Sequence, residues 1–457
     1  MFATADTIVA IATPPGRGGI GVVRVSGPDA HQISLRLVTT DRLFEPRHAT
    51  LTYAVAPSGA STKLDEVVVT YFPAPHSYTG DDVVEVSAHG SPVILQTIVE
   101  RAIREGARLA HPGEFTLRAF LNGRLDLLQA EAVADLVDAV TPLQARAAFD
   151  QLQGTLTTVI GAIDQDLFDL IAGLEASVDF PEEGYRFIEP VNLVCALDEL
   201  TTRTEALLAD ARRGRLIREG LQIALIGEPN VGKSSLFNAL VGAARAIVTP
   251  IPGTTRDLVT EALDLDGVRV TLIDTAGLRE VTEVVESEGV ARARQVVAVA
   301  DLVLFVVDIS DMNGTSEENA PQIKENKLLV VGNKADLLSE ESCDSIRNGC
   351  SRVDVMVSAR SGKGLDALRT AILAKLDIEL LNERPALTNA RHVALVERAH
   401  EAFMRARDAV RDSSGRVPEE FVLADLQDAR AAFEEISGRR TPDDVLAHIF
   451  SRFCIGK

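Results

Sequence analysis

A glycine-rich segment that ends in lysine and serine is the strongest chemical signal in this chain. Residues 227–234 read GEPNVGKS and match the pattern GxxxxGK[ST]. In this pattern the glycines let the backbone wrap around phosphates, and the N–H groups that open the following helix favour negative charge. Lys233 would reach the β- and γ-phosphates and Ser234 would bind Mg²⁺. The segment therefore predicts a nucleotide-binding loop.

Three later motifs indicate which nucleotide is bound. Residues 274–277 read DTAG, residues 333–336 read NKAD and residues 358–360 read SAR, each at the end of an apolar run. A carboxylate at Asp336 can accept two N–H bonds from guanine, which adenine cannot offer, so the motif favours GTP over ATP. The predicted nucleotide contacts are Asn230, Val231, Gly232, Lys233, Ser234, Ser235, Thr249, Thr254, Thr255, Asp274, Thr275, Ala276, Gly277, Asn333, Lys334, Asp336, Ser358, Ala359 and Arg360.

The segment that would complete the metal site lies between the first two motifs. Residues 251–257 read IPGTTRD, and Thr255 is the expected second Mg²⁺ ligand beside Ser234, supplied by a switch loop. The alternative is an ordinary turn rich in glycine and threonine.

Hydrolysis cannot follow the Ras pattern. A Ras-like enzyme positions the attacking water with a glutamine directly after the DxxG motif, and this chain has Leu278 there. Four acids of the next segment remain open as a base, and most of them are solvated under the simpler interpretation. Asn230 and loop carbonyls could hold a monovalent cation such as K⁺ against the phosphates, although a structural asparagine is the alternative. The four acids are Glu280, Glu283, Glu286 and Glu288.

The elements that must position these motifs alternate between strand and helix. Within residues 220–377, nearly continuous apolar runs precede each motif, which is typical of a mostly parallel sheet covered on both faces. Residues 1–120 show short β-like runs broken by Gly and Pro, with one helical stretch at 92–105, and predict an α+β domain.

The remaining parts of the chain are helical. Residues 121–219 carry apolar side chains at steps of three and four, interrupted at Asp179-Phe180-Pro181, and residues 378–457 return to helix. The chain is therefore predicted to be a multidomain α/β and α protein. A Ras-like P-loop domain at 220–377 would be inserted into a discontinuous helical domain.

Composition indicates a soluble chain. Its 457 residues carry a formal charge of −21, so any nucleic-acid contact needs a local basic patch. The arginines at 212, 213, 215 and 218 could form one, but a solvated helix end is the preferred interpretation. Neither a secretory signal nor a membrane-length apolar run is visible, and the four cysteines form no CxxC pair, which favours a cytoplasmic location with reduced thiols.

Taken together, these segments resemble the tRNA-modification GTPases of the MnmE (TrmE) family. The resemblance covers essentially the whole chain. It is carried by TIVAIATPPGRGGIGVVRVSG near the N-terminus, HPGEFTLRAFLNGRLDLLQAEAVADL in the centre, the full GTPase motif set and the terminal FCIGK.

The resemblance implies roles for particular residues. GTP hydrolysis would depend on K⁺-linked dimerisation of the G domains, with Glu286 as the water-positioning acid. The N-terminal domain would resemble folate-dependent aminomethyltransferases, bind 5-formyltetrahydrofolate or another tetrahydrofolate derivative, and form a constitutive homodimer. Cys454 would be either catalytic or a small buried hydrophobe. The matching positions are Asn230, Thr249, Ile251 and Thr254 for K⁺, and Arg24, Glu85, Arg124 and Lys457 for folate.

The family works with a FAD-containing partner, MnmG (GidA). The resemblance implies that the two proteins form a heterotetramer and add an aminomethyl or carboxymethylaminomethyl group at carbon 5 of the wobble uridine in certain tRNAs. A competing hypothesis is an assembly GTPase of the Era or EngA kind, which shares the GTPase motifs but predicts a KH-like or second G domain. A third, an aminomethyltransferase acting alone, leaves the inserted GTPase unexplained.

Overall fold

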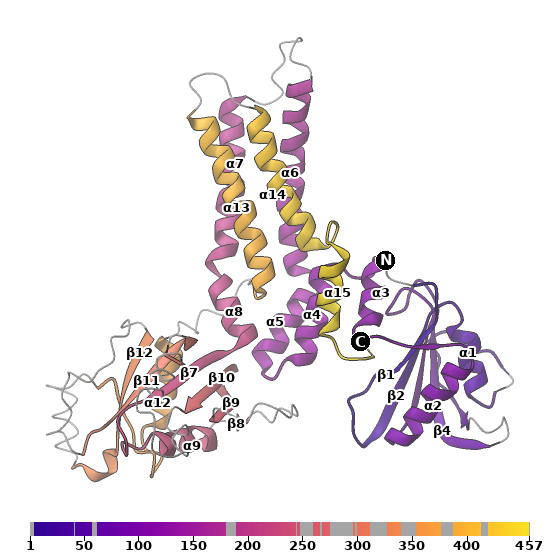
Figure 1. The fold of residues 1–457 in the computed structure, drawn as a ribbon, viewed down its shortest axis with the longest axis horizontal. Coiled ribbons are helices and arrows are strands. Elements are labelled where there is room, and N and C mark those ends of the chain that lie inside the picture. Colours follow the sequence, from indigo (N-terminus) through magenta and orange to yellow (C-terminus); the bar gives the residue numbers. More distant parts are fainter. Residues whose placement is uncertain are drawn as a thin grey trace, which may run out of the picture. The chain divides into compact units, whose positions relative to one another are not determined.

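The computed structural model describes most of the chain. The described residues are 4–40, 42–56, 62–179, 189–243, 245–246, 259–265, 267–274, 296–297, 299–310, 327–339, 353–375, 387–412 and 419–456. They form two compact units (Figure 1). One unit comprises residues 1–137, 148–205 and 394–457, and the other comprises 138–147 and 206–393.

The first unit contains a six-stranded sheet near the N-terminus. Its spatial order is β3-β4-β5-β2-β1-β6, and every neighbouring pair is antiparallel except β1 and β6. Buried residues of α1 and α2 pack with the strands in one core. The elements are β1 (Ile8–Ile11), β2 (Gly18–Ser26), α1 (Ala30–Leu37), β3 (Thr50–Val55), β4 (Lys63–Phe72), β5 (Val83–Gly90), α2 (Pro92–Arg104) and β6 (Arg108–Leu109).

The predicted α+β character of this region is confirmed, but β3, α1 and the two-residue strand β6 were not predicted. β3 exposes Leu51 and Tyr53 and buries the residues between and after them, so its hydrophobicity alternates instead of forming a run. α1 is only eight residues long, which is too short to show a convincing helical period.

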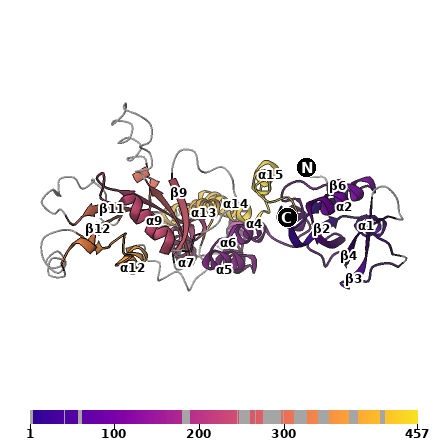
Figure 2. The ribbon, with the colours of Figure 1, turned by 90° about the horizontal axis from the view of Figure 1, so that it is seen from below.

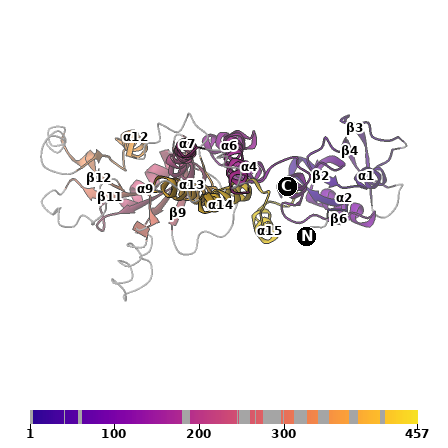
Figure 3. The ribbon, with the colours of Figure 1, turned by 90° about the horizontal axis from the view of Figure 1, so that it is seen from above.

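Helices make up the rest of the first unit. Figure 1 shows α6, α7, α13 and α14 as long, side-by-side helices, and Figures 2 and 3 show the same group from below and above. α6 is described as far as Asp179, and the rest of the predicted break, Phe180-Pro181, lies outside the described residues. Parts of α4, α5, α7 and α13 belong to the second unit. The bounds are α3 (Glu114–Leu121), α4 (Leu127–Asp138), α5 (Pro142–Leu152), α6 (Thr155–Asp179), α7 (Pro190–Ala209), α13 (Ala390–Arg411), α14 (Glu419–Ser437) and α15 (Asp443–Ser451).

The second unit contains a seven-stranded sheet. Its order is β13-β12-β11-β7-β10-β9-β8, and the five strands from β13 to β10 are parallel. β9 pairs antiparallel with both β10 and β8, and this antiparallel edge was not predicted. The elements are α8 (Ala211–Glu219), β7 (Leu221–Ile226), α9 (Lys233–Ala243), β8 (Arg245–Ala246), β9 (Val259–Leu265), β10 (Val268–Asp274), β11 (Leu302–Asp308), β12 (Leu328–Asn333), β13 (Val355–Met356) and α12 (Leu365–Lys375).

Two hydrophobic clusters flank this sheet, as expected for a parallel sheet with both faces covered. The larger one packs Leu236 and Leu240 of α9 and Leu368 of α12 against alternate strand residues. The carboxyl ends of β7, β10, β11 and β12 therefore meet at one edge of the sheet, where the predicted motifs begin. In the described part of the chain, no helix has the length and apolar character needed to span a bilayer.

Candidate functional site

The phosphate loop joins β7 to α9, as its pattern predicted. Two of its glycines have positive φ, 152° at Gly227 and 94° at Gly232. A Cβ on Gly227 would lie 2.3 Å from the carbonyl oxygen of Val306, and one on Gly232 would lie 2.3 Å from Nδ2 of Asn333. Only glycine satisfies both the backbone conformation and this close approach, so the loop can take the tight curve that encloses a phosphate.

The charged groups of this loop suit a nucleotide with its Mg²⁺. The Nζ of Lys233 donates to the carbonyl oxygens of Gly227 and Glu228 at 3.0 and 2.8 Å, so the buried ammonium lies across the mouth of the loop. Ser234 Oγ donates to Oδ2 of Asp274 at 3.0 Å. A hydroxyl and a carboxylate are oxygen ligands of the kind that Mg²⁺ prefers. These residues therefore fit a Mg²⁺-bound phosphate chain.

Other predicted residues of the loop differ in exposure. Asn230 is exposed and has a left-handed backbone with φ of 67°, which asparagine tolerates better than most residues. Val231 is buried, whereas Ser235 is exposed on the first turn of α9. The amide of Asn230 is thus open to solvent beside the phosphate position.

Asn333 connects the phosphate loop to the part of the site where the nucleobase motifs lie. Its Nδ2 donates to the carbonyl oxygen of Val231 at 2.9 Å, and its Oδ1 accepts from the backbone N–H of Ala359 at 3.0 Å. The asparagine is 2% exposed, so both bonds are shielded from water. One side chain therefore sets the spacing between three of the predicted motifs. The N–H of Ala359 is therefore already engaged within the protein.

Asp336 presents an exposed carboxylate in this part of the site. Ser358 Oγ donates to its Oδ1 at 2.6 Å, and this hydrogen bond lowers the pKa of Asp336. The carboxylate is therefore ionised at neutral pH and accepts hydrogen bonds only. This is the state needed to accept two N–H bonds from guanine.

Lys334 has a partner that the sequence did not indicate. Its Nζ lies 2.5 Å from Oδ2 of Asp308, the last residue of β11. Burial raises the pKa of Asp308, but hydrogen bonds from Lys334 and Ser310 outweigh it and hold this pKa below its usual value. An acid at the end of the strand LVLFVVD, facing the site edge, was the available signal.

Several predicted positions lie outside the described residues. They are Thr249, Ile251, Thr254, Thr255, Thr275, Ala276, Gly277, Glu286 and Lys457. Among the described residues, no group of three or more His, Cys, Asp or Glu side chains is arranged to hold a metal ion.

A second site forms around Arg24 on β2. Its guanidinium pairs with Glu85 of β5, at 2.9 Å from Nε and 2.8 Å from Nη2, and its Nη1 donates to the carbonyl oxygen of Gly456 at 3.2 Å. It also lies over the rings of Tyr78 and Phe115, 5.2 and 5.6 Å from their centroids. The structure thus brings two predicted folate residues together and adds two aromatic ones that the sequence did not indicate.

The C-terminal segment packs beside this site. A Cβ on Gly456 would lie 2.4 Å from the carbonyl oxygen of Ile11, so the chain passes directly against the end of β1. Cys454 is a free, exposed thiol, which makes the interpretation as a small buried hydrophobe wrong. Arg124 is exposed, and its Cγ would lie 3.3 Å from a Cβ on Gly80, in the same loop as Tyr78.

The strand, the glycine loop and the guanine-side carboxylate define the class of protein as a P-loop guanine-nucleotide-binding protein. Two family models match the chain: the GTP-binding protein TrmE N-terminus over residues 7–124 and the MnmE helical domain over residues 127–454. The chain belongs to the tRNA modification GTPase MnmE family.

Curated relatives align along the full chain. The tRNA modification GTPase MnmE of Koribacter versatilis is 46% identical and covers 99% of each chain. That of Aquifex aeolicus is 42% identical and covers 99% of this chain and all of its own length. A solved G domain of the T. maritima FeoB iron transporter is 26% identical and covers 34% of this chain and 98% of its own length, with a TM-score of 0.24, and adds nothing to the assignment.

Proposed function

We propose that this protein hydrolyses GTP and, with a FAD-containing partner of the MnmG kind, takes part in modifying carbon 5 of the wobble uridine of certain tRNAs. The observation that carries the GTP assignment is the bridge made by Asn333, which connects the phosphate loop to the segment beside Asp336. Membership of the MnmE family over the full chain supports the tRNA role over the alternative of an Era- or EngA-like assembly switch.

In the nucleotide site, the tasks of Lys233, Ser234 and Asp274 follow from their contacts, and that of Thr255 follows from its place in the motif. Lys233 would exchange its two carbonyl acceptors for the β- and γ-phosphates, because a phosphate offers a stronger, charge-assisted acceptor. Ser234 and Thr255 would bind Mg²⁺, which neutralises phosphate charge, and Asp274 would hold Ser234 in place through its hydrogen bond.

For the hydrolytic step, we propose Glu286 as the residue that positions the water. Leu278 has no polar group to orient a water, so an acid must come from another position of that segment. Asn230, Thr249, Ile251 and Thr254 would hold K⁺, whose charge offsets the negative charge that develops on the phosphates. The exposed amide of Asn230 supports this role.

We propose that the Arg24 site binds a tetrahydrofolate derivative such as 5-formyltetrahydrofolate. Glu85 Oε1 is paired with Arg24, while Oε2 has no partner among the described residues and can accept N–H bonds from a pterin-like ring. Tyr78 and Phe115 offer aromatic faces beside it. Arg124, Lys457 and Cys454 would complete the site, with Cys454 accessible for chemistry.

The proposed assembly is a homodimer formed through residues 1–120. The helical parts 121–219 and 378–457 would carry the inserted GTPase domain 220–377 and transmit its nucleotide state to the tRNA-modifying site. A dimer of this protein and a dimer of its FAD-containing partner would together form a heterotetramer in the cytoplasm.

Nucleoside analysis of tRNA from cells that lack this protein tests the proposal. Loss of the wobble-uridine modification, restored by the wild-type gene, is the expected result. Retained modification would reject the tRNA role and favour an assembly switch, whose deletion would instead alter ribosome profiles.

Hydrolysis measured in KCl and in NaCl tests the cation. The rate is expected to be higher in KCl, and equal rates would remove K⁺ from the proposal. Glu286→Ala is expected to lower turnover by about 10²- to 10⁴-fold with GTP affinity unchanged. Glu280→Ala is the matched control, and an equal loss in both variants would assign the role to the whole acidic segment.

A further inference from the structure

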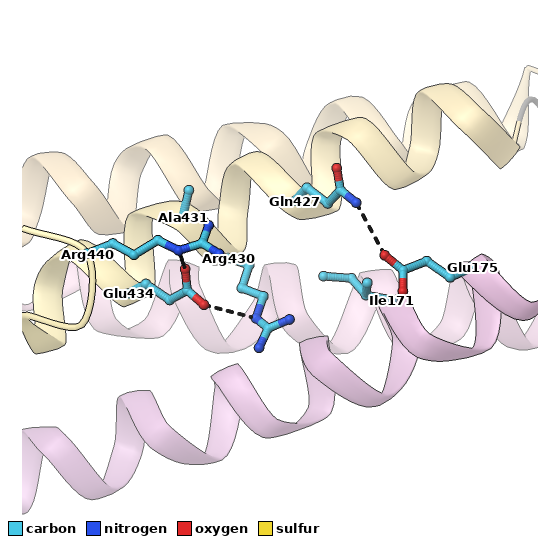
Figure 4. A pocket seen from close by; sticks show the side chains of 7 residues that line it. All are labelled: Ile171, Glu175, Gln427, Arg430, Ala431, Glu434 and Arg440. Carbon is cyan, nitrogen blue, oxygen red and sulfur yellow. Dashed lines mark hydrogen bonds and ion pairs between the residues drawn. The ribbon is translucent and has the colours of Figure 1, made fainter.

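A pocket of about 360 Å³ lies between α6 and α14, away from both sites described above (Figure 4). Small-molecule pockets in proteins usually have volumes of about 300 to 1,000 Å³, so this one suits a small ligand. α6 contributes Ile171 and Glu175, and α14 with the turn that follows it contributes Gln427, Arg430, Ala431, Glu434 and Arg440.

The charged and polar residues of this pocket differ in exposure, because Glu175, Gln427 and Arg440 are open to solvent while Arg430 is partly covered. Gln427, Arg430 and Glu434 follow one another at steps of three and four, so they share the face of α14 that meets α6. Glu434 is only 8% exposed. Buried ion pairs contribute little net stability compared with apolar packing. Holding two helices together is therefore a poor explanation for this cluster.

One end of the pocket has an excess of positive charge. Oε2 of Glu434 lies 2.8 Å from Nε of Arg440, and Oε1 lies 3.4 Å from Nε of Arg430, so two guanidinium groups share one carboxylate (Figure 4). Neither contact has hydrogen-bond geometry, and Oε2 of Glu434 and Nε of Arg430 are buried without a hydrogen bond. The guanidinium of Arg430 lies over the ring of Phe168, 4.6 Å from its centroid. The terminal nitrogens of both arginines have no hydrogen-bond or ion-pair partner among the described residues. This end is therefore suited to a carboxylate.

The other end is acidic. Gln427 Nε2 donates to Oε1 of Glu175 at 3.3 Å, and Oε2 of Glu175 has no partner among the described residues. Figure 4 shows Glu175 and Gln427 on one side of Ile171 and the arginines with Glu434 on the other. The lining carries two positive and two negative charges, so it matches a ligand that is neutral overall and carries both signs. A phosphate or another multiply charged anion would face two carboxylates.

We propose that this pocket binds a small zwitterion with one carboxylate and one ammonium group. The carboxylate accepts hydrogen bonds from Arg430 and Arg440, the ammonium donates to Glu175, and the carbon chain contacts Ile171 and Ala431. The proposal is independent of the nucleotide and folate sites, because none of these residues belongs to either.

Titration of the full-length protein with two isomeric amino acids tests this inference. δ-Aminovalerate separates its charges by four methylene groups, norvaline holds them on one carbon, and valerate and pentylamine carry one charge each. Binding is followed by calorimetry up to about 10 mM, because a ligand this small is expected to bind near the millimolar range. At least one isomer should bind about fivefold more tightly than either single-charge compound, and the stronger isomer reports the spacing of the ligand's charges.

Variants assign the binding to this pocket. Arg440→Gln and Glu175→Gln should each weaken binding by about three- to tenfold, as expected for partly exposed charged contacts. Arg411→Gln is the matched control, because Arg411 pairs with Asp198 and does not line the pocket. Thermal unfolding and GTP binding show that each variant is folded. The inference is overturned if no isomer binds, if the single-charge compounds bind as tightly, or if the two pocket variants bind like the control.

Discussion

The nucleotide site and the Arg24 site are built in different ways. Each motif of the nucleotide site lies within a few residues of the end of a parallel strand, and the sheet order brings those ends to one edge. The Arg24 site combines β2, β5, the loop at Tyr78, α3 and the C-terminal segment, and the bond from Arg24 to Gly456 joins residues 432 positions apart. A site of the first kind can be recognised from local motifs, whereas a site of the second kind exists only after the chain has folded.

The two sites also differ in how their charges are balanced. Lys233 donates to two backbone carbonyl oxygens, and a phosphate is the stronger, charge-assisted acceptor. Arg24 is already paired with a carboxylate. A ligand at Arg24 must therefore offer donors as well as acceptors, while a ligand at Lys233 needs mainly negative charge.

The largest expected effect is on base recognition. Asp336→Asn replaces an acceptor by a donor, so GTP affinity should fall by at least about 100-fold and affinity for xanthosine triphosphate should rise. Fluorescent-nucleotide titration measures both affinities. Asp366→Asn, on the first turn of α12, is the control and should bind GTP normally. Unchanged GTP affinity in Asp336→Asn would mean that the motif does not contact the base.

The second-largest expected effect is on folate affinity. Its measurement tests whether the Arg24 site is independent of the nucleotide site. Arg24→Ala removes charge-assisted contacts, so affinity for 5-formyltetrahydrofolate should fall by about 10- to 100-fold while GTP hydrolysis is retained. Arg24→Lys should give an intermediate affinity, because lysine keeps the charge without the planar group. Calorimetry measures folate binding. Normal binding by Arg24→Ala would place the folate site elsewhere.

A smaller effect concerns the bridge within the nucleotide site. Asn333→Ala leaves the carbonyl of Val231 and the N–H of Ala359 without their buried partner, and should cost about 1 to 3 kcal/mol in the free energy of unfolding. Denaturant unfolding measures it, with the exposed Ser361→Ala as control. If both variants unfold alike, the motifs are held in place by the sheet alone.

The smallest expected effect depends on pH. The folded-state pKa of Asp308 is depressed, so its ion pair with Lys334 stabilises the fold above the unfolded-state pKa of about 4 and is lost as pH falls through the lower, folded-state pKa. Asp308→Asn should therefore lower stability at pH 7 by less than about 1 kcal/mol. The difference in stability between this variant and wild type should vanish in acid. Unfolding midpoints measured at pH 7 and in acid test this. A difference that persists in acid would assign the loss to packing.

The sequence predicted the regular elements well where hydrophobicity was continuous. The apolar runs predicted within residues 220–377 became β7, β10, β11 and β12 with nearly the expected bounds, whereas the run at 354–359 gave only the two-residue strand β13. β3, an edge strand, and β9, which lies between β10 and the edge strand β8, were missed because neither carries a continuous apolar run. Asp308 was missed because its partner, Lys334, is 26 residues away on a neighbouring strand end.

The sequence by itself determined the phosphate loop and the identity of the base, because both depend on short motifs whose residues act within one turn of the backbone. Tertiary structure decided how those motifs are spaced, since Asn333 reaches Val231 only when β12 lies in its place in the sheet. It also decided the surroundings of Arg24 and the charged pocket between α6 and α14. Those sites depend on contacts between distant segments, and such contacts form when burial of apolar surface brings the segments together.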